Sequence, residues 1–392
     1  MFTSVCRRSW RVPPWLIVLS GLATFSALAR RATAEPSPPL ASTPSPASTA
    51  APPQVSPPIG SGAALYARYC QLCHAADATG YAADNAPSLV SPTFLATASD
   101  EFIASGIRLG RPETAMAAYG KLRGGPLDDA QIAAIVEFLR TKGPAATALP
   151  ELKVSGDTAR GASLYARHCQ SCHGGGKTPA KAPQLSNREF LAAASPAFVR
   201  HAIVHGRPPT RMPAFEKRLS QSQVDDLVAW FASLRTKGAQ RSPSATPPSA
   251  APSASAPVVI HPKGKAPDFS LREGRFVSAE QVKRALDARR RIIIVDARAA
   301  SDWIQFHIPG AISIPYYETA LLDRIPNDGT WVVAYCGCPH HASGEVVDAL
   351  RRRNYPHTAV LDEGILFWRR QGYALAGEAA EPEGKAPERP QP

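Results

Sequence analysis

The sequence predicts three folded domains: two all-α domains that share one repeated sequence, followed by one α/β domain with a mainly parallel sheet. The first observation is the repeat, which relates residues 59–142 to residues 157–238. The second is a pair of Pro-rich stretches of the kind that separates folded units. The third is a set of short β-branched runs confined to residues 266–378. At 392 residues, the chain is long enough for each domain to bury its own core.

Residues 1–34 are expected to direct export. Arginines precede an apolar run over residues 12–29, and Ala32-Thr33-Ala34 has the small-x-small pattern of a signal-peptide cleavage site. Two arginines also follow the run, as they do where a segment is retained as a membrane anchor. Both interpretations place the remainder in the periplasm, either soluble after cleavage or held by a membrane tether.

Two linkers and a tail are expected outside the folded domains, and the net charge limits the choice of partner. Linkers are expected at residues 35–58 and 239–265, with a tail at 379–392, because such compositions bury too little apolar surface to fold. The formal charge of +12 favours acidic proteins or an anionic membrane surface. The basic residues are scattered and no nucleic-acid-binding motif accompanies them, so no nucleic acid partner is expected.

The two repeats are expected to be small helical units. Both contain Gly-Ala-x-Leu-Tyr-Ala-Arg before a cysteine, then Ala-Pro-x-Leu, then Gly-Arg-Pro before a methionine, and both close on Leu-Arg-Thr-Lys-Gly. Apolar residues recur at i, i+3, i+4 and i+7 from Ile132 and from Val224, which predicts a closing amphipathic helix in each copy. Asp128 and Ser220 stand where the N-caps of these helices would lie. No strand pattern intervenes.

The motif Cys-x-x-Cys-His begins at Cys70 and again at Cys169. In this motif the two thiols form thioethers with the vinyl groups of a haem, and the histidine becomes an axial ligand of the iron. A redox-active Cys-x-x-Cys pair would need a βαβ setting, and structural zinc would need two further ligands nearby. Neither accompanies the motifs. The sequence therefore predicts two covalently bound haem c groups, attached through Cys70, Cys73, Cys169 and Cys172, with His74 and His173 as iron ligands.

Taken together, the repeats resemble class I c-type cytochromes. The resemblance implies that Met116 and Met212 are the second axial ligands, the alternative being methionines of the core. Met212 lies in Arg-Met-Pro-Ala-Phe, as in the distal loop of that family, whereas Met116 lacks the following proline. Ligation by histidine and methionine fills both axial positions, which favours electron transfer over chemistry on oxygen or peroxide.

The last third of the chain has the pattern of an α/β domain. Residues 291–295, 331–335 and 357–361 are short β-branched or apolar runs, which predict buried strands. Residues 278–289 and 343–353 are helical stretches between or beside them. This alternation predicts a parallel sheet with helices on both faces.

A set of motifs recurs through this region: Val295-Asp-Ala-Arg298, Asp302-Trp303, His307-Ile-Pro-Gly-Ala-Ile-Ser-Ile-Pro315, and Leu361-Asp-Glu-Gly364 with Trp368. With these motifs, the region resembles the rhodanese (sulfurtransferase) family. In that family, a cysteine at the carboxyl end of a strand takes up sulfane sulfur as a persulfide and passes it to a thiophilic acceptor. Cys336 occupies that place, and a following helix N-terminus would stabilise a thiolate or persulfide.

The loop after Cys336 departs from the family pattern, because it lacks the arginine common in thiosulfate-using members and adds Cys338. Three interpretations follow. Cys336 is a persulfide carrier, with Cys338 as a resolving thiol or as the carrier itself. Cys336 and Cys338 instead form a soft-metal site with His340 and His341. Or the fold is inactive and kept for binding.

Asp296, Arg298 and His307 are expected to be framework hydrogen-bonding residues rather than catalytic ones.

The sequence thus predicts an exported dihaem c-type cytochrome that transfers electrons and is coupled to a domain handling sulfane sulfur through a cysteine persulfide. Its expected partners are redox proteins of the respiratory chain and small sulfur compounds. The alternative is a plain dihaem electron carrier with a catalytically inactive rhodanese-fold docking or metal-sensing module. A third possibility, a sulfur dehydrogenase acting at the haem, requires an open axial position.

Overall fold

The computed structural model describes residues 60–81, 85–175, 180–239, 257–337 and 340–379. The predicted export segment, the linker at 35–58 and almost all of the tail at 379–392 lie outside these ranges. The described residues all belong to one compact contact unit. Within them, no helix is long and apolar enough to cross a membrane.

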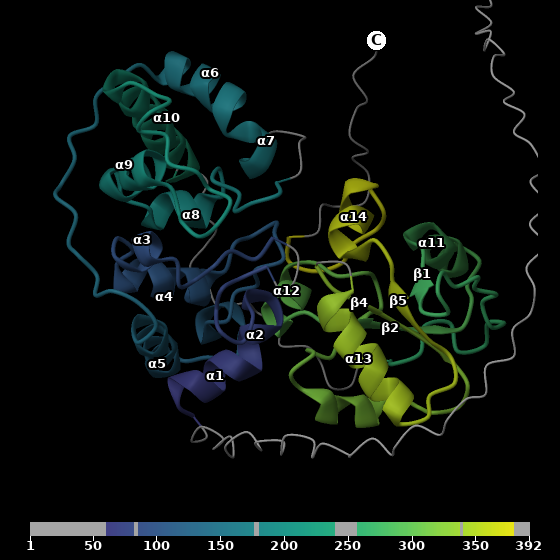
Figure 1. Ribbon diagram of the computed structural model, residues 1–392. Coiled ribbons are helices and arrows are strands. Elements are labelled where there is room, and N and C mark those ends of the chain that lie inside the picture. The colour runs from purple at the N-terminus through teal and green to yellow at the C-terminus, as the bar shows by residue number, and fades with distance from the viewer. Residues whose placement is uncertain (1–59, 82–84, 176–179, 240–256, 338–339, 380–392) are drawn as a thin grey trace, which may run out of the picture. The chain divides into compact units, whose positions relative to one another are not determined.

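The first repeat is all-helical, as predicted (Figure 1). Its opening helix packs across its closing helix at Gly62, where a Cβ would lie 1.9 Å from the backbone oxygen of Ala134. Asp128 begins the closing helix with a capping box, accepting from the amide of Gln131 while the Gln131 side chain accepts from the Asp128 amide. The elements are α1 (Gly62–Tyr69), α2 (Gln71–His74), α3 (Pro92–Leu95), α4 (Asp100–Leu109), the 3-10 helix η1 (Lys121–Arg123) and α5 (Asp129–Arg140).

The second repeat has the same plan. Gly161 takes the place of Gly62, and a Cβ there would lie 2.1 Å from the backbone oxygen of Asp226. Ser220 caps the closing helix by accepting from the Gln223 amide, as the sequence predicts. The elements are α6 (Thr158–His168), α7 (Gln170–His173), α8 (Arg188–Ala193), α9 (Pro196–His205) and α10 (Gln221–Ala239).

The two repeats pack against each other about a pseudo-twofold axis. Helix α4 contacts α8 and its counterpart α9 contacts α3, which are the same contact seen from each side. Asn187 donates to the backbone oxygen of Pro112 at 2.9 Å, and Ser91, at the matching position, donates to that of Pro208 at 2.7 Å. Buried apolar residues of both repeats form one continuous core.

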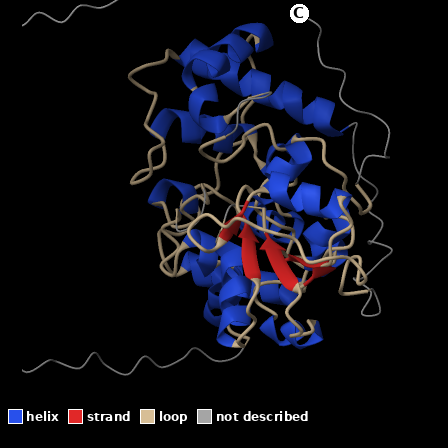
Figure 2. Ribbon diagram, turned by 90° about the vertical axis from the view of Figure 1, so that its right-hand side faces the viewer, coloured by secondary structure: helices blue, strands red, loops and turns tan. Residues whose placement is uncertain are grey.

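The C-terminal domain is an α/β fold around a five-stranded parallel sheet of order β1-β5-β4-β2-β3 (Figure 2). Its elements are β1 (Phe276–Val277), α11 (Ala279–Asp287), β2 (Ile292–Asp296), α12 (Ala300–Gln305), β3 (Ile312–Ser313), the 3-10 helix η2 (Thr319–Arg324), β4 (Trp331–Tyr335), α13 (His341–Arg352), β5 (Thr358–Leu361) and α14 (Gly364–Arg370).

Both faces of the sheet are buried. Strand β2 alternates between two apolar clusters, with Ile293 and Val295 in one and Ile292 and Ile294 in the other. Helix α13 covers the first face, and α11 and α14 cover the second. The predicted strands and helices agree with β2, β4, β5, α11 and α13 to within two residues at each end.

The predicted linker at 239–265 is too long at its C-terminal end. Ile260 exchanges backbone hydrogen bonds with Ile292 of β2 at 2.8 and 3.1 Å, and its side chain packs against the second apolar cluster. The domain therefore includes residues from about 258 onward, because Val258 and Val259 also pack against the core. Composition alone did not reveal this short apolar segment, because a stretch that contains proline and lysine follows it.

Candidate functional site

Each Cys-x-x-Cys-His motif lies at a break between two helices. Helix α1 ends at Tyr69, and Cys70 begins the turn into α2, which ends at the buried His74. The hydroxyl of Tyr66 donates to the backbone oxygen of Ala75 at 2.7 Å and so holds the end of the motif. Tyr165 makes the equivalent bond in the second repeat, at 2.6 Å.

The first cysteine of each motif is unsuited to thiol redox chemistry. Burial raises the pKa of Cys70 to about 12 and that of Cys169 to about 11. A reactive Cys-x-x-Cys pair needs the opposite, a lowered pKa that yields thiolate at neutral pH. No group of three or more His, Cys, Asp or Glu side chains with metal-site geometry occurs in the described part of the chain, so the zinc alternative has no ligand set there.

Both histidines are held in the tautomer that leaves one nitrogen free for iron. His74 Nδ1 lies 2.9 Å from the backbone oxygen of Pro87, and His173 Nδ1 lies 2.8 Å from that of Pro183. Because a carbonyl only accepts, each Nδ1 is the protonated donor and each Nε2 keeps its lone pair. Burial also lowers the pKa of both imidazoles, which keeps them neutral.

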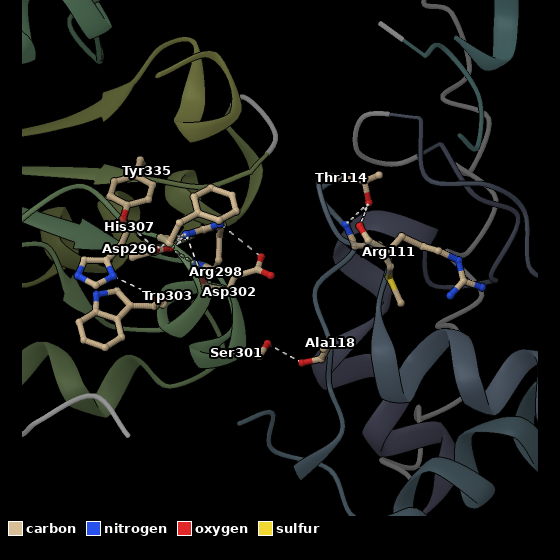
Figure 3. Close-up of polar contacts among 12 residues, drawn as sticks. Arg111, Thr114, Ala118, Asp296, Arg298, Ser301, Asp302, Trp303, His307 and Tyr335 are labelled. Carbon is tan, nitrogen blue, oxygen red and sulfur yellow. Dashed lines mark hydrogen bonds and ion pairs between the residues drawn. The ribbon is translucent and has the colours of Figure 1, made fainter. Parts of the chain in front are cut away.

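The two methionine loops share two hydrogen bonds around their methionines. The carbonyl of Met116 accepts from the Arg111 amide at 2.8 Å, and the Met116 amide donates to Thr114 Oγ1 at 3.2 Å (Figure 3). Met212 has the same two bonds, at 3.0 and 3.2 Å. Both hydrogen bonds therefore form although Met116 lacks the following proline.

A half-buried arginine lies beside each methionine loop. Arg111 and Arg207 come from the two copies of Gly-Arg-Pro, and burial lowers the pKa of each to about 10. Nη2 of Arg207 is buried without a hydrogen-bond partner. Haem carries two carboxylates, and an anion is the partner that such a guanidinium lacks. The thiols, neutral imidazoles, thioether sulfurs and guanidinium groups together fit haem c.

In the α/β domain, Cys336 directly follows β4. Its side chain is only 2% exposed, and its Sγ lies 3.2 Å from Oγ of Ser343 in the first turn of α13. Its carbonyl accepts from the Ile365 amide at 3.0 Å. Cys338 lies outside the described residues, so the resolving-thiol and soft-metal interpretations stay predictions. The cysteine is thus held between a strand end and a helix N-terminus.

The histidines after the loop have different surroundings. His340 Nε2 lies 2.8 Å from Oδ1 of Asp362, and the His340 ring packs on Phe276 at 4.1 Å between centroids. Hydrogen bonding to Arg272 lowers the pKa of Asp362, which keeps this carboxylate ionised. Nδ1 of His341 is buried with no hydrogen-bond partner.

A buried ion pair organises the strand ends next to Cys336. Arg298 Nη2 donates to Asp296 at 2.7 Å and to the backbone oxygen of Phe306 at 2.6 Å, and Tyr335 Oη donates to Asp296 at 2.8 Å (Figure 3). The His307 ring stacks on the Trp303 ring, with 4.0 Å between their centroids. These contacts fit the prediction that Asp296, Arg298 and His307 belong to the framework.

Sequence reasoning did not single out Arg111, Arg207 or Ser343. The repeated Gly-Arg-Pro before each methionine is a signal that could have revealed the arginines. Nothing in the spacing between Cys336 and Ser343 indicates that the two side chains meet.

Comparison with known proteins identifies both parts of the chain. A family model described as "Cytochrome C oxidase, cbb3-type, subunit III" matches residues 57–139 and 156–231, and a rhodanese-like domain model matches residues 278–371. The chain is a tandem c-type cytochrome with a C-terminal rhodanese-like domain. Domains of the cytochrome c type bind haem c covalently.

Relatives among curated proteins match the cytochrome part. Cytochrome c6 of Limnospira maxima is 31% identical over 99% of its own length and 21% of this chain. The cbb3-type cytochrome c oxidase subunit FixP of a Bradyrhizobium species is 30% identical over 44% of this chain and 60% of FixP. Dihydro-heme d1 dehydrogenase of Pseudomonas aeruginosa is 42% identical over 19% of this chain. This chain spans only 15% of that dehydrogenase and 60% of FixP.

Proposed function

We propose that this protein is an exported dihaem cytochrome c in which Cys336 carries sulfur as a persulfide. The electrons released leave through the two haems to redox proteins of the respiratory chain. The observation that carries the proposal is the position of Cys336, which lies between the end of β4 and the first turn of α13, with Ser343 Oγ at 3.2 Å from its sulfur. A hydroxyl at that distance and a helix N-terminus both stabilise a sulfur anion.

The haem ligands assigned by the proposal are equivalent in the two repeats. Cys70 and Cys73 in the first repeat, and their counterparts in the second, hold the haems covalently. His74 binds iron through its free Nε2 because Nδ1 is engaged with the Pro87 carbonyl. Met116 and Met212, whose loops share two hydrogen bonds, would supply the thioether sulfurs that hold the irons.

The sulfur chemistry is a two-electron oxidation followed by transfer. Thiolate of Cys336 and hydrosulfide form one S–S bond, the S–H bond breaks, and one proton and two electrons are released. The pair of electrons passes to two one-electron acceptors, which is the chemistry that bound haem c supplies. An acceptor thiolate then attacks the outer sulfur, the S–S bond breaks, and Cys336 is regenerated as the acceptor leaves as a persulfide.

The compartment and partners are proposed on two grounds. The N-terminal arginines and apolar run predict export, and covalent attachment of haem c in bacteria takes place outside the cytoplasmic membrane. FixP, which the cytochrome part resembles, is named as a subunit of a cytochrome c oxidase. We therefore place the protein in the periplasm and expect its electrons to reach a respiratory enzyme.

The test adds hydrosulfide to the oxidised full-length holoprotein and follows two signals. Haem reduction is read from absorbance, and the persulfide on Cys336 from mass spectrometry. In Cys336→Ser we expect no persulfide and haem reduction slowed at least about tenfold. Reduction by dithionite is the control and stays unchanged. Equal reduction rates in the variant and the natural protein would overturn the proposal.

A second candidate function is a plain dihaem electron carrier whose rhodanese-like domain serves for docking. The observation that favours it is the 2% exposure of Cys336, which limits access by a sulfur donor. It predicts that haem reduction by hydrosulfide does not depend on Cys336 at all.

A further inference from the structure

The two methionine loops share the hydrogen bonds around their methionines but differ in several side chains. The second loop carries a basic residue and two prolines at positions where the first loop has alanines and one acidic residue. The differing pairs, first repeat before second, are Glu113 and Pro209, Ala115 and Arg211, Ala117 and Pro213, and Tyr119 and Phe215. The loop of the first repeat is thus less basic and has smaller side chains directly before and after its methionine.

The loop of the first repeat lies against the rhodanese-like domain (Figure 3). Ser301 of α12 donates to the backbone oxygen of Ala118 at 2.6 Å, and Ser301 is fully buried. Ala118 is only 3% exposed, whereas its counterpart Ala214 is exposed. At the rim, Glu113 lies 3.6 Å from the guanidinium of Arg369. Among the residues that the structure describes, the loop of the first repeat is therefore a contact surface for the rhodanese-like domain.

The same contact brings the Cys336 loop to the methionine loop. A Cβ built on Gly337 would lie 3.2 Å from Cα of Ala115, so a single methyl group would fill the space between the two backbones. Cys336 is bonded to Gly337, and Ala115 is bonded to Met116. The path between the two sulfur-bearing residues therefore contains a single through-space step.

The haem-attachment helix of the first repeat reaches the same domain. Tyr316 Oη donates to the backbone oxygen of Tyr69 at 2.8 Å, and the Tyr69 and Tyr317 rings lie 4.8 Å apart. Leu72, between the two haem cysteines, packs against the apolar cluster that contains Cys336. The second repeat has His168 and Ser171 in place of Tyr69 and Leu72.

From these contacts we propose that the haem of the first repeat is the direct electron acceptor of Cys336, and that the second haem is the outlet. Electrons released at Cys336 cross from Gly337 to the Met116 loop, then pass to the second repeat across the pseudo-twofold interface. The inference rests on the proposed function, because it assigns the first acceptor of the same electrons. It also gives a reason for the unusual residues around Met116, which form a docking surface.

The test uses a matched pair of variants of the full-length holoprotein. Ala118→Trp inserts a large ring where Ser301 meets the loop, and Ala214→Trp places the same ring at the equivalent exposed position of the second repeat. Hydrogen exchange read by mass spectrometry reports the interface without reference to activity. We expect faster exchange over residues 115–120 and 299–303 in Ala118→Trp and no change there in Ala214→Trp.

Haem reduction by hydrosulfide is then measured in both variants. We expect it to slow at least about tenfold in Ala118→Trp and to stay unchanged in Ala214→Trp. Ser301→Ala, which removes only the hydrogen bond, gives a smaller change in the same direction. Faster hydrogen exchange at the interface with an unchanged rate of haem reduction in Ala118→Trp would overturn the inference. Hydrogen exchange that stays slow at the interface in this variant would overturn it as well.

Ferricyanide, a soluble one-electron acceptor, separates this inference from the proposed function. With ferricyanide present, Ala118→Trp should still form the persulfide on Cys336, because only the internal acceptor has been moved away. Failure of the natural protein to form any persulfide would refute the proposed function itself.

Discussion

Asp302 offers a test of the electrostatics beside the candidate sulfur site. Its carboxylate lies 3.7 Å from Arg298 Nη1, and its side chain is 13% exposed. Burial raises the pKa of Asp302 from 3.8 to about 6, although Arg298 opposes the rise. Arg298 is more closely paired with Asp296, so it compensates the charge on Asp302 only in part.

The direction of the pH effect follows from this difference. As pH rises, the unfolded chain releases the Asp302 proton near 3.8, whereas the folded protein retains it until about 6. Stability therefore falls between about pH 4 and 6 and is lower by about 3 kcal/mol above that range. In Asp302→Asn the side chain stays neutral, so the variant gains up to about 3 kcal/mol at pH 7 and almost nothing at pH 3.5.

Urea denaturation of the full-length holoprotein, followed by tryptophan fluorescence at both pH values, measures the difference. Asp323→Asn is the matched control, because Asp323 is 82% exposed and its loss should change stability by less than about 1 kcal/mol. An Asp302→Asn variant no more stable than the natural protein at pH 7 would refute the argument. It would mean that the ion pair with Arg298 outweighs the cost of burial.

Two further predictions concern the haems and the sulfur site. Met116→Ala and Met212→Ala should each remove the methionine-sulfur absorption band of one haem. Each should also lower the reduction potential of that haem alone, because methionine ligation raises the potential. If a variant keeps both bands, the methionine that it replaces is a core residue and not an iron ligand. Ser343→Ala should lower the yield of persulfide on Cys336 about tenfold at a fixed hydrosulfide concentration, because a hydrogen bond to an anion is worth about 1.5 kcal/mol or more. Mass spectrometry measures that yield, and an unchanged yield would remove Ser343 from the site.

Local sequence predicted most of the fold. The amphipathic helix from Asp129 to Arg140 has a 3.6-residue period and a capping residue, and β2 is five consecutive buried residues. Strands β1 and β3 went unpredicted, because two residues are too few to show any period. Strands β1 and β3 form where a neighbouring strand has backbone groups left to pair. Their formation therefore depends on the sheet and not on the segment itself.

The residues that would hold each haem covalently are close together in the sequence. Cys70, Cys73 and His74 lie within five residues, so their chemistry is visible in the sequence. The tautomer of His74 is not visible, because it depends on a carbonyl 13 residues away. The buried environment of Arg207 likewise arises only when the two repeats pack together, with its Nη1 donating to the backbone oxygen of Thr93 at 3.2 Å.

Local motifs were enough to identify the two cytochrome c repeats and the rhodanese-like domain, because each motif is short and its spacing is visible along the chain. Which repeat meets Cys336 is apparent only in the folded protein. Ser301 and Ala118 are 183 residues apart, and their hydrogen bond forms only when the surfaces of two folded domains pack together. Such a contact depends on the shape of two folded surfaces, and no local pattern encodes it.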